Sequence, residues 1–169
     1  MFRLLFVQQR GLMAEEFPRL KALDVAPEFS LLDQDSKPFK LSDYLGQKVI
    51  AYFYPAAGSP GCTKEAADFQ ESLEDFKNLG FTVVGISPDD VARIKSFQES
   101  HELEFALLSD PDFVAHKAFG AFGEKTLYGR KFRGALRSTV IINEKGLVID
   151  ALYSVSSTGH TKALLKILS

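Results

Sequence analysis

Three short apolar runs, separated by amphipathic segments, constrain the fold of this chain more than any other feature. The first two are rich in β-branched and aromatic residues, which is typical of strands buried on both faces of a sheet. The runs are Lys48–Tyr54, Phe81–Ser87 and Phe105–Leu108. Apolar residues at helical spacing from Ala66 to Phe76 predict one helix that ends at Gly80, and Pro88 opens a second helix. This alternation predicts a mainly parallel sheet with helices on both faces.

The remaining parts of the chain predict antiparallel additions to that sheet. Ser138–Asn143 and Leu147–Tyr153 read as strands, and Gly146 between them suits the tight turn of a β-hairpin. Thr161–Leu168 predicts a closing helix, and Ala26–Leu32 with the polar turn after it predicts a second short hairpin. An α/β protein with a central mixed β-sheet flanked by helices, ending in a C-terminal β-hairpin and helix, is compatible with a thioredoxin-like fold.

Length and composition fit a single folded domain. The chain has 169 residues, of which 46% are hydrophobic and 25% charged. We assign residues 20–169 to this domain, and residues 1–19 form an N-terminal extension to which no function is assigned. The net charge of -2 gives no general attraction to nucleic-acid phosphates. No stretch approaches the roughly 20 apolar residues of a membrane span or resembles a signal peptide, so a cytoplasmic protein without membrane or nucleic-acid partners is expected.

A single cysteine, Cys62, excludes two further classes of protein. One thiol cannot form an internal disulfide or a zinc site with paired cysteines. Cys62 follows a buried strand, in the loop where open α/β sheets place their ligands. Ser59 is a good N-cap and Pro60 a good first helical residue, which places Cys62 at the third position of the helix. The helix start favours the thiolate form of the side chain.

The helix start alone does not ionise a thiol at neutral pH. A free cysteine is only about 3% thiolate there, and reaching a reactive thiolate requires roughly 3–4 kcal/mol, of which a helix end supplies at most ~2 kcal/mol. A second positive group is therefore expected nearby. Arg137, at the start of a predicted strand, is better placed than Lys64, which is expected to be solvated. The alternative for Arg137 is a surface salt bridge.

The pattern of these residues resembles the active site of the peroxiredoxins. The motif is Pro55-x-x-x-Ser59-x-x-Cys62 after an apolar strand, with Arg137 opening a later strand. Further collinear motifs from about Leu20 to the C-terminus resemble the bacterioferritin-comigratory-protein (PrxQ-like) branch: Ala26–Phe29, Leu107–Pro111, Gly123–Lys125, Leu127–Phe132, Arg137–Ile142 and Gly159–His160. This resemblance implies a thioredoxin-like fold and reduction of hydrogen peroxide and organic hydroperoxides through a cysteine, without metal, haem or flavin.

The resemblance also implies a role for each matching residue. Cys62 is the nucleophile that attacks the peroxide and becomes a sulfenic acid. Ser59 hydrogen-bonds the thiolate and the peroxide, and Arg137 stabilises the thiolate and the leaving oxygen. Pro55 walls the pocket. Glu65, one helical turn after Cys62, orients Arg137 through an ion pair, with a solvated helix residue as the alternative.

One departure from the family pattern concerns the step in which the sulfenic acid is reduced back to a thiol. Many members of this branch carry a resolving cysteine five residues after the nucleophile, where this chain has Ala67, and others carry it on a later helix. The sulfenic acid must therefore be resolved by an external thiol, from a thioredoxin- or glutaredoxin-type protein or a low-molecular-weight compound, or by Cys62 of a second copy. A monomer is expected, with a dimer as the alternative.

Two other functions fit parts of the sequence. A Cys-His hydrolase would pair Cys62 with His101, His116 or His160, although none of these lies in a recognised local context. A thioredoxin-like binding or chaperone module would contain an inert, buried Cys62. The glycine-rich stretches at residues 120–123 and 129–131, with the basic residues around them, are interpreted as solvated loops.

Overall fold

The computed structural model describes residues 16–169. Its strands, in chain order, are β1 (Ser30–Asp33), β2 (Pro38–Lys40), β3 (Lys48–Phe53), β4 (Phe81–Ser87), β5 (Ala106–Ser109), β6 (Phe122–Leu127), β7 (Arg130–Ala135), β8 (Ser138–Ile142) and β9 (Val148–Leu152). Its helices are the 3-10 helix η1 (Leu41–Tyr44) and the α-helices α2 (Pro60–Glu71), α3 (Leu73–Asn78), α4 (Val91–Ser100), α5 (Val114–Ala118) and α6 (His160–Leu168).

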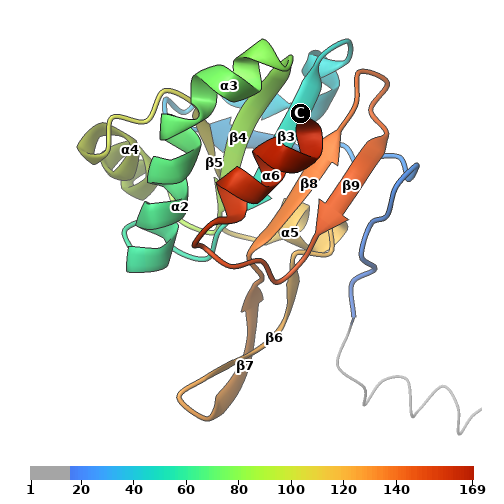
Figure 1. The fold of residues 1–169 in the computed structure, drawn as a ribbon. Coiled ribbons are helices and arrows are strands. Elements are labelled where there is room, and N and C mark those ends of the chain that lie inside the picture. Colours follow the sequence, from blue (N-terminus) through green and yellow to red (C-terminus); the bar gives the residue numbers. More distant parts are fainter. Residues whose placement is uncertain (1–15) are drawn as a thin grey trace, which may run out of the picture.

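The central sheet is mixed, as predicted. Within residues 16–169 it has seven strands in the order β2-β1-β5-β4-β3-β8-β9 (Figure 1). The three apolar runs form the parallel centre, β3, β4 and β5. The predicted terminal hairpin is β8 and β9, and β8 pairs antiparallel with β3. The first predicted hairpin is β1 and β2. Strong β-branched and aromatic runs therefore gave reliable strand predictions.

Two apolar layers cover the sheet, one on each face. Helices α2, α3, α4 and α6 pack on one face around the buried side chains Ile50, Tyr52, Phe69, Phe76, Ile94, Ile141 and Leu164. The other face is covered by η1, α5 and the segment before β1, around Phe29, Phe53, Ile86, Phe119 and Val140. Successive β3 side chains alternate between these layers, which explains why the whole strand is apolar. Figure 1 shows α6 and α5 on opposite sides of the sheet.

The first predicted helix is interrupted. Instead of one helix from residue 60 to residue 79, the structure has α2 and α3, separated by Ser72. Ser72 has φ -97° and ψ 6°, outside the α-helical region, and its N–H still bonds to carbonyl oxygens of α2. Phe69 and Phe76 are both fully buried, so the two helices keep a common apolar face. Apolar spacing predicted this face correctly and could not detect the break.

The basic, glycine-rich region around residue 129 is a β-hairpin, and its interpretation as loops was wrong. Strands β6 and β7 pair antiparallel from Phe122↔Ala135 to Leu127↔Arg130, and in residues 16–169 they pair only with each other. Tyr128 and Gly129, both with positive φ, form the two-residue turn. Most residues of the two strands are exposed, and their polar residues outnumber the apolar ones, so the usual strand signal is absent.

The N-terminal extension is described only in part, because residues 1–15 lie outside the described residues. Phe17 packs edge-to-face on Phe122 with ring centroids 5.8 Å apart. The N–H of Leu20 donates to the Tyr153 hydroxyl, 2.8 Å away, and that hydroxyl donates to the carbonyl of Phe119. None of the helices in residues 16–169 has the length and apolarity needed to cross a membrane.

Gly85 in β4 is closely packed against the side chains of Tyr52 and Leu107. A Cβ atom built on Gly85 of β4 would lie 2.9 Å from Tyr52 Cζ and 3.0 Å from Leu107 Cδ2. We expect Gly85→Ala to lower the free energy of unfolding by about 1–3 kcal/mol, because neither buried neighbour can move freely. Urea unfolding measures this change. Gly134→Ala in β7 is the matched control, since its Cβ would meet no atom closer than 3.6 Å. Equal stability losses in both variants would contradict the packing argument.

Candidate active site

The cysteine lies at the start of α2, as predicted. Ser59 is the N-cap, Pro60 opens the helix, and Cys62 follows at the third position. The Ser59 hydroxyl accepts a hydrogen bond from the Cys62 N–H, with 3.4 Å between Oγ and N, and donates to the carbonyl of Ala56 at 3.0 Å. The Cys62 side chain is 1% exposed. In this state the Ser59 hydroxyl is engaged with the backbone, and it holds the first turn of the helix together.

The loop before the helix is fixed by two residues that sequence analysis did not identify as part of the site. The N–H of Ala57 donates to Asp89 Oδ2 at 2.7 Å, and the carbonyl of Ala57 accepts from Arg93 Nε at 3.3 Å and Nη2 at 3.1 Å. Asp89 and Arg93 also form an ion pair at 3.2 Å. Both follow β4, the strand parallel to β3, so they reach the same edge of the sheet. The sequence pattern around Asp89 predicted only the start of a helix and did not indicate a contact with the loop before Cys62.

Arg137 bridges the cysteine and a buried carboxylate. Its Nη2 lies 3.3 Å from Cys62 Sγ, and its Nη1 donates to Glu65 Oε1 at 2.8 Å. Pairing of β8 with β3 explains this meeting, because Ser138 lies opposite Phe53 and thus brings Arg137 to the edge where the loop begins. Gly61 permits the approach, since a Cβ there would lie 3.3 Å from Arg137 Nη2.

The Arg137–Glu65 pair is largely removed from solvent. The side chains are 16% and 1% exposed, respectively. Burial raises the pKa of Glu65 to about 7, although the charge of Arg137 acts in the opposite direction. For Arg137, burial lowers the pKa, but the neighbouring Glu65 and Cys62 outweigh this effect and raise it. The guanidinium therefore stays charged beside the sulfur, which is the second positive group that the helix start required.

Two buried tyrosines form the inner side of the site. The rings of Tyr52 and Tyr54 lie 5.4 Å apart, and burial raises the pKa of both phenols. Their hydroxyl oxygens and Glu65 Oε2 have no hydrogen-bond partner among residues 16–169. Both phenols are therefore neutral at physiological pH and do not compete with Cys62 for the charge of Arg137.

Two further residues singled out in the sequence are Pro55, in the loop before α2, and Lys64, within α2. Pro55 is half-buried between the end of β3 and the helix. Lys64 is exposed and pairs with Asp68 at 2.8 Å, as expected for a solvated residue.

All three histidines of the chain are in the described part, and none is hydrogen-bonded to Cys62. His160 lies 2.8 Å from Thr139 Oγ1, and His116 lies 2.7 Å from Asp110 Oδ2 in a fully buried pair. His101 packs against the ring of Phe97. Burial, with a contribution from Arg137, lowers the pKa of His160 to about 4, so this histidine is neutral at physiological pH. The thiol therefore interacts with a permanent cation and not with an imidazole base, and this arrangement does not favour a Cys-His hydrolase.

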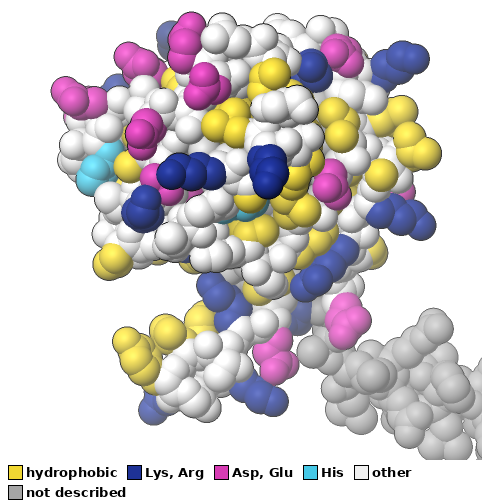
Figure 2. Space-filling view, in the orientation of Figure 1, with side chains coloured by type: hydrophobic (Ala, Val, Ile, Leu, Met, Phe, Trp, Pro, Cys, Tyr) yellow, Lys and Arg dark blue, Asp and Glu magenta, His cyan; other side chains and the backbone are white. Residues whose placement is uncertain are grey.

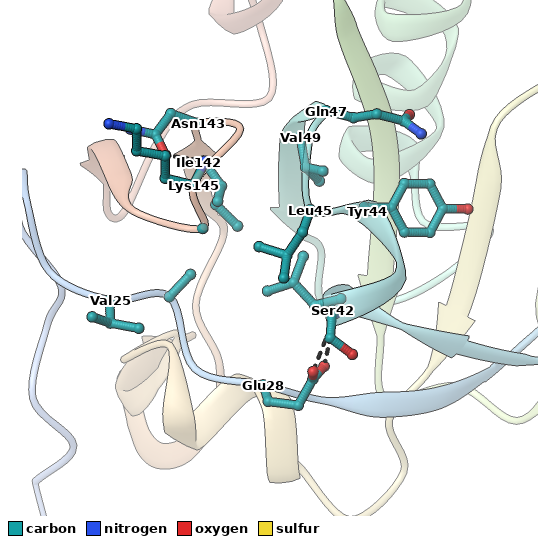
Figure 3. A pocket seen from close by; sticks show the side chains of 13 residues that line it. Val25, Glu28, Ser42, Tyr44, Leu45, Gln47, Val49, Ile142, Asn143 and Lys145 are labelled. Carbon is teal, nitrogen blue, oxygen red and sulfur yellow. Dashed lines mark hydrogen bonds between the residues drawn. The ribbon is translucent and has the colours of Figure 1, made fainter.

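A cavity of about 180 Å³ lies at the opposite edge of the sheet and is not part of this site. Figure 3 shows it between the start of β3 at Val49 and the end of β8 at Ile142, with Glu28 bonded to the backbone of Ser42. Because Cys62 follows the end of β3 and Arg137 precedes β8, the cavity and the cysteine are separated by the length of these strands. No group of three or more potential metal ligands of the Cys, His, Asp or Glu type occurs within residues 16–169.

The burial of Glu65 predicts a pH-dependent stability. Folded Glu65 keeps its proton up to about pH 7, whereas the unfolded residue releases it near 4.5. The contribution of Glu65 to stability is therefore full below the lower value and is lost as the pH rises through the higher one. We expect this loss, on the order of 2 kcal/mol between pH 4.5 and pH 7.5, to disappear in Glu65→Gln. Urea unfolding at both pH values tests it, with Glu71→Gln on the exposed side of α2 as the control. The same pH dependence in Glu65→Gln and the parent would contradict the prediction.

Comparison with known sequences identifies the family. The sequence profile of the AhpC/TSA family matches residues 22–151. Peroxiredoxin Bcp of Escherichia coli K12 is 38% identical over 146 residues, which cover 86% of this chain and 94% of the relative. A Mycobacterium tuberculosis H37Rv relative whose name also describes it as a peroxiredoxin is 48% identical over 151 residues, covering 89% of this chain and 96% of the relative.

Solved structures agree with this assignment. Peroxidoxin BcpB from Mycobacterium tuberculosis matches with a TM-score of 0.78 and 34% identity, over 89% of this chain and 97% of that one. Peroxiredoxin Q of Xanthomonas campestris matches with a TM-score of 0.80 and 30% identity, over 91% and 97%. These neighbours confirm the expected thioredoxin-like fold. The chain therefore belongs to the AhpC/TSA family, as a peroxiredoxin similar to the Bcp and PrxQ proteins, and is a thiol-dependent peroxidase.

Proposed function

We propose that this peroxiredoxin reduces hydrogen peroxide and organic hydroperoxides through a sulfenic acid at Cys62. The observation that carries the proposal is the 3.3 Å contact between Arg137 Nη2 and Cys62 Sγ at a helix start. Two positive influences then act on one sulfur in a buried site, where electrostatic interactions are strong. The structurally similar bacterioferritin comigratory protein of Xanthomonas campestris is described as having alkyl peroxide reduction activity, which supports the organic substrates.

The first half of the cycle needs only this chain and the peroxide. The Cys62 thiolate attacks the terminal oxygen of ROOH, the O–O bond breaks, and the products are Cys62–SOH and RO⁻, which takes up a proton to give ROH. Arg137 stabilises both the thiolate and the negative charge that develops on the leaving oxygen. Glu65 holds the guanidinium in place through the 2.8 Å ion pair. Pro55 walls the pocket, and Ser59 hydrogen-bonds the peroxide once its hydroxyl turns from the Ala56 carbonyl.

The second half of the cycle requires an external thiol, because the chain has no other cysteine. A thiol R′SH attacks the sulfenic sulfur, releases water and leaves a mixed disulfide on Cys62, and a second thiol then releases the Cys62 thiol and a disulfide. Since the Cys62 side chain is 1% exposed, the start of α2 has to move before the incoming sulfur can reach it. We assign this catalysis to residues 20–169 of a monomeric antioxidant enzyme of the cytoplasm, with a dimer as the alternative.

Mass spectrometry of the peroxide-treated protein tests this function. With low peroxide and no thiol, we expect one oxygen atom to be added at Cys62. With an added thiol reductant, we expect a mixed disulfide at the same residue, followed by return to the parent mass. An unmodified Cys62 under both conditions would contradict the peroxidase mechanism and favour a module with an inert cysteine. A dimer linked by a Cys62–Cys62 disulfide would show that Cys62 of a second copy, and not an external thiol, resolves the sulfenic acid.

A further inference from the structure

The hairpin of β6 and β7, residues 122–135, projects from the body of the protein and is called the arm here. Figure 1 shows it extending beyond the edge of the sheet where β3 ends and β8 begins, which is also the edge of the active site. Only Leu136 separates the end of the arm from Arg137. The N–H of Leu136 donates to the carbonyl of Ala121 at 2.8 Å and so joins the two ends of the arm. Within the described residues the two strands have no other strand beside them. The peroxidase mechanism uses none of the arm's side chains.

The arm has a charge opposite to that of the rest of the chain. Residues 122–135 contain four basic side chains and one acidic one, a net charge of +3: Lys125, Arg130, Lys131 and Arg133 against Glu124. Since the whole chain has a net charge of -2, the remainder has -5 (-2 − 3). Figure 2 shows Lys and Arg side chains together with hydrophobic ones on the arm. A positive arm on a negative body attracts an acidic surface to one place on the molecule.

The tip of the arm also exposes large hydrophobic side chains. Tyr128 is 96% exposed, Leu127 56% and Phe132 44%. Aromatic residues and arginine beside exposed apolar side chains are typical of protein interfaces. Isolated exposed apolar residues are common in proteins, but here three of them share one small hairpin with the positive charge. This combination fits a protein partner with an acidic and apolar surface.

One face of the arm continues toward the active site. Pairing of Lys125 with Phe132 and of Leu127 with Arg130 places these four side chains on the same face. Burial and the nearby Arg137 lower the pKa of Lys125, whereas Cys62 acts in the opposite direction, so this lysine lies within electrostatic range of both. The geometry of the chain gives the same direction: β7 ends at Ala135, and Arg137, two residues later, contacts Cys62 Sγ at 3.3 Å, so the base of the arm lies beside the active site.

We propose that the arm is the docking surface for the protein dithiol that reduces oxidised Cys62, and that this reductant has an acidic and apolar surface around its own reactive thiol. The inference rests on the proposed function, because it needs an external reductant. The reductant's first thiol forms the mixed disulfide with Cys62 and water leaves. Its second thiol then attacks its own sulfur in that bond, which releases the Cys62 thiol and the oxidised reductant.

Two other partners fit the arm less well. A low-molecular-weight thiol requires no apolar, positively charged platform. An anionic membrane or a nucleic acid is larger than the arm and would also come close to the rest of the protein. The net charge of -5 there repels such a partner. A compact acidic protein can contact the arm alone, so that attraction to the arm exceeds repulsion from the body.

The test measures reduction of Cys62 without using peroxide. Cys62 of the full chain is converted to its mixed disulfide with thionitrobenzoate, and release of thionitrobenzoate is followed with either a thioredoxin of acidic isoelectric point or dithiothreitol. The arm variant is Arg130→Glu with Lys131→Glu. The control is Lys77→Glu with Lys145→Glu, two exposed lysines that lie near the start of β4 and the end of β8, at the opposite edge of the sheet. Circular dichroism and urea unfolding check that all variants are folded.

We expect the arm variant to lose at least about tenfold in the rate with thioredoxin and to stay within about twofold of the parent with dithiothreitol. The control should stay within about twofold with both reductants, and added salt should slow only the reaction of the parent and control with thioredoxin. Tyr128→Ala should also slow the thioredoxin reaction and leave the dithiothreitol reaction unchanged.

Several results would overturn the proposal. They are an unchanged thioredoxin rate in the arm variant, an equal loss with dithiothreitol, or a parent that dithiothreitol reduces and neither thioredoxin nor glutaredoxin does. Arm-dependent binding to phosphatidylglycerol vesicles or to DNA, with the thioredoxin rate intact, would assign the arm to those partners. Because the starting adduct is made without peroxide, a parent that fails to react with peroxide contradicts the proposed function and leaves the docking measurement valid.

Discussion

Replacement of Cys62 with serine abolishes thiol-dependent peroxide consumption, and we expect kcat/KM to fall by at least about 10³-fold, to the uncatalysed background. A serine hydroxyl is not ionised at neutral pH and cannot accept oxygen to form a sulfenic acid, so the loss concerns the reacting atom itself. Peroxide consumption with an added thiol measures the effect, and intact mass measures the absence of an added oxygen.

The control for this variant keeps the sulfur and changes its neighbour in the helix. Thr63→Ser alters the residue after Cys62 in α2 and should leave the rate within about twofold of the parent. Serine is nearly isosteric with cysteine, so Cys62→Ser should remain folded, and urea unfolding checks this. Undiminished turnover in Cys62→Ser would disprove the mechanism, because no other cysteine could replace it.

Replacement of Arg137 with alanine has the second-largest expected effect. We expect peroxide to oxidise Cys62 about 10²-fold more slowly, a loss of about 3 kcal/mol of transition-state stabilisation, because the 3.3 Å contact with the sulfur disappears. Arg137→Lys should recover only part of the rate, since one ammonium group cannot replace the two nitrogens that separately contact Cys62 and Glu65. Single-turnover oxidation, followed by rapid mixing, measures these rates without a reductant.

The same variant should also reveal the cost of the buried pair. Without Arg137, Glu65 is a buried carboxyl with no counter-charge, and its pKa rises further because the attraction that opposed burial is gone. The residue then stays protonated to higher pH, so Arg137→Ala should be destabilised more at pH 8 than at pH 6. Arg130→Ala, in the exposed arm, is the control for loss of one positive charge. An oxidation rate of Arg137→Ala within about twofold of the parent would remove Arg137 from the active site.

The order of these effects follows from how directly each residue touches the reacting sulfur. Cys62 supplies it, Arg137 contacts it at 3.3 Å, and Glu65 acts through Arg137. Asp89 and Arg93 act one step further away, because they hold the loop before the helix through Ala57. Residues that follow β3 and β4 or precede β8 thus meet at one edge of the sheet.

Local patterns predicted much of the fold but missed features without a covered face. Apolar runs predicted β3, β4 and β8 because their side chains are buried on both faces. The arm was interpreted as loops because its strands carry no apolar layer, and the break at Ser72 was missed because apolar spacing continues across it. Local patterns also could not indicate Asp89 and Arg93, because their contacts with the site depend on the parallel pairing of β3 with β4.

Helix capping is a local property, so the sequence alone places the thiol: Ser59 and Pro60 start the helix that has Cys62 in its first turn. The sequence also nominated Arg137, from its position at the start of a predicted strand and from the resemblance to peroxiredoxins, and Glu65 from that resemblance. Long-range packing brings Arg137, 75 residues after Cys62, to the sulfur and buries Glu65 beside it. Antiparallel pairing of β8 with β3 creates the first contact, and packing of α2 on the sheet creates the second, so both depend on interactions between distant parts of the chain that no local pattern encodes.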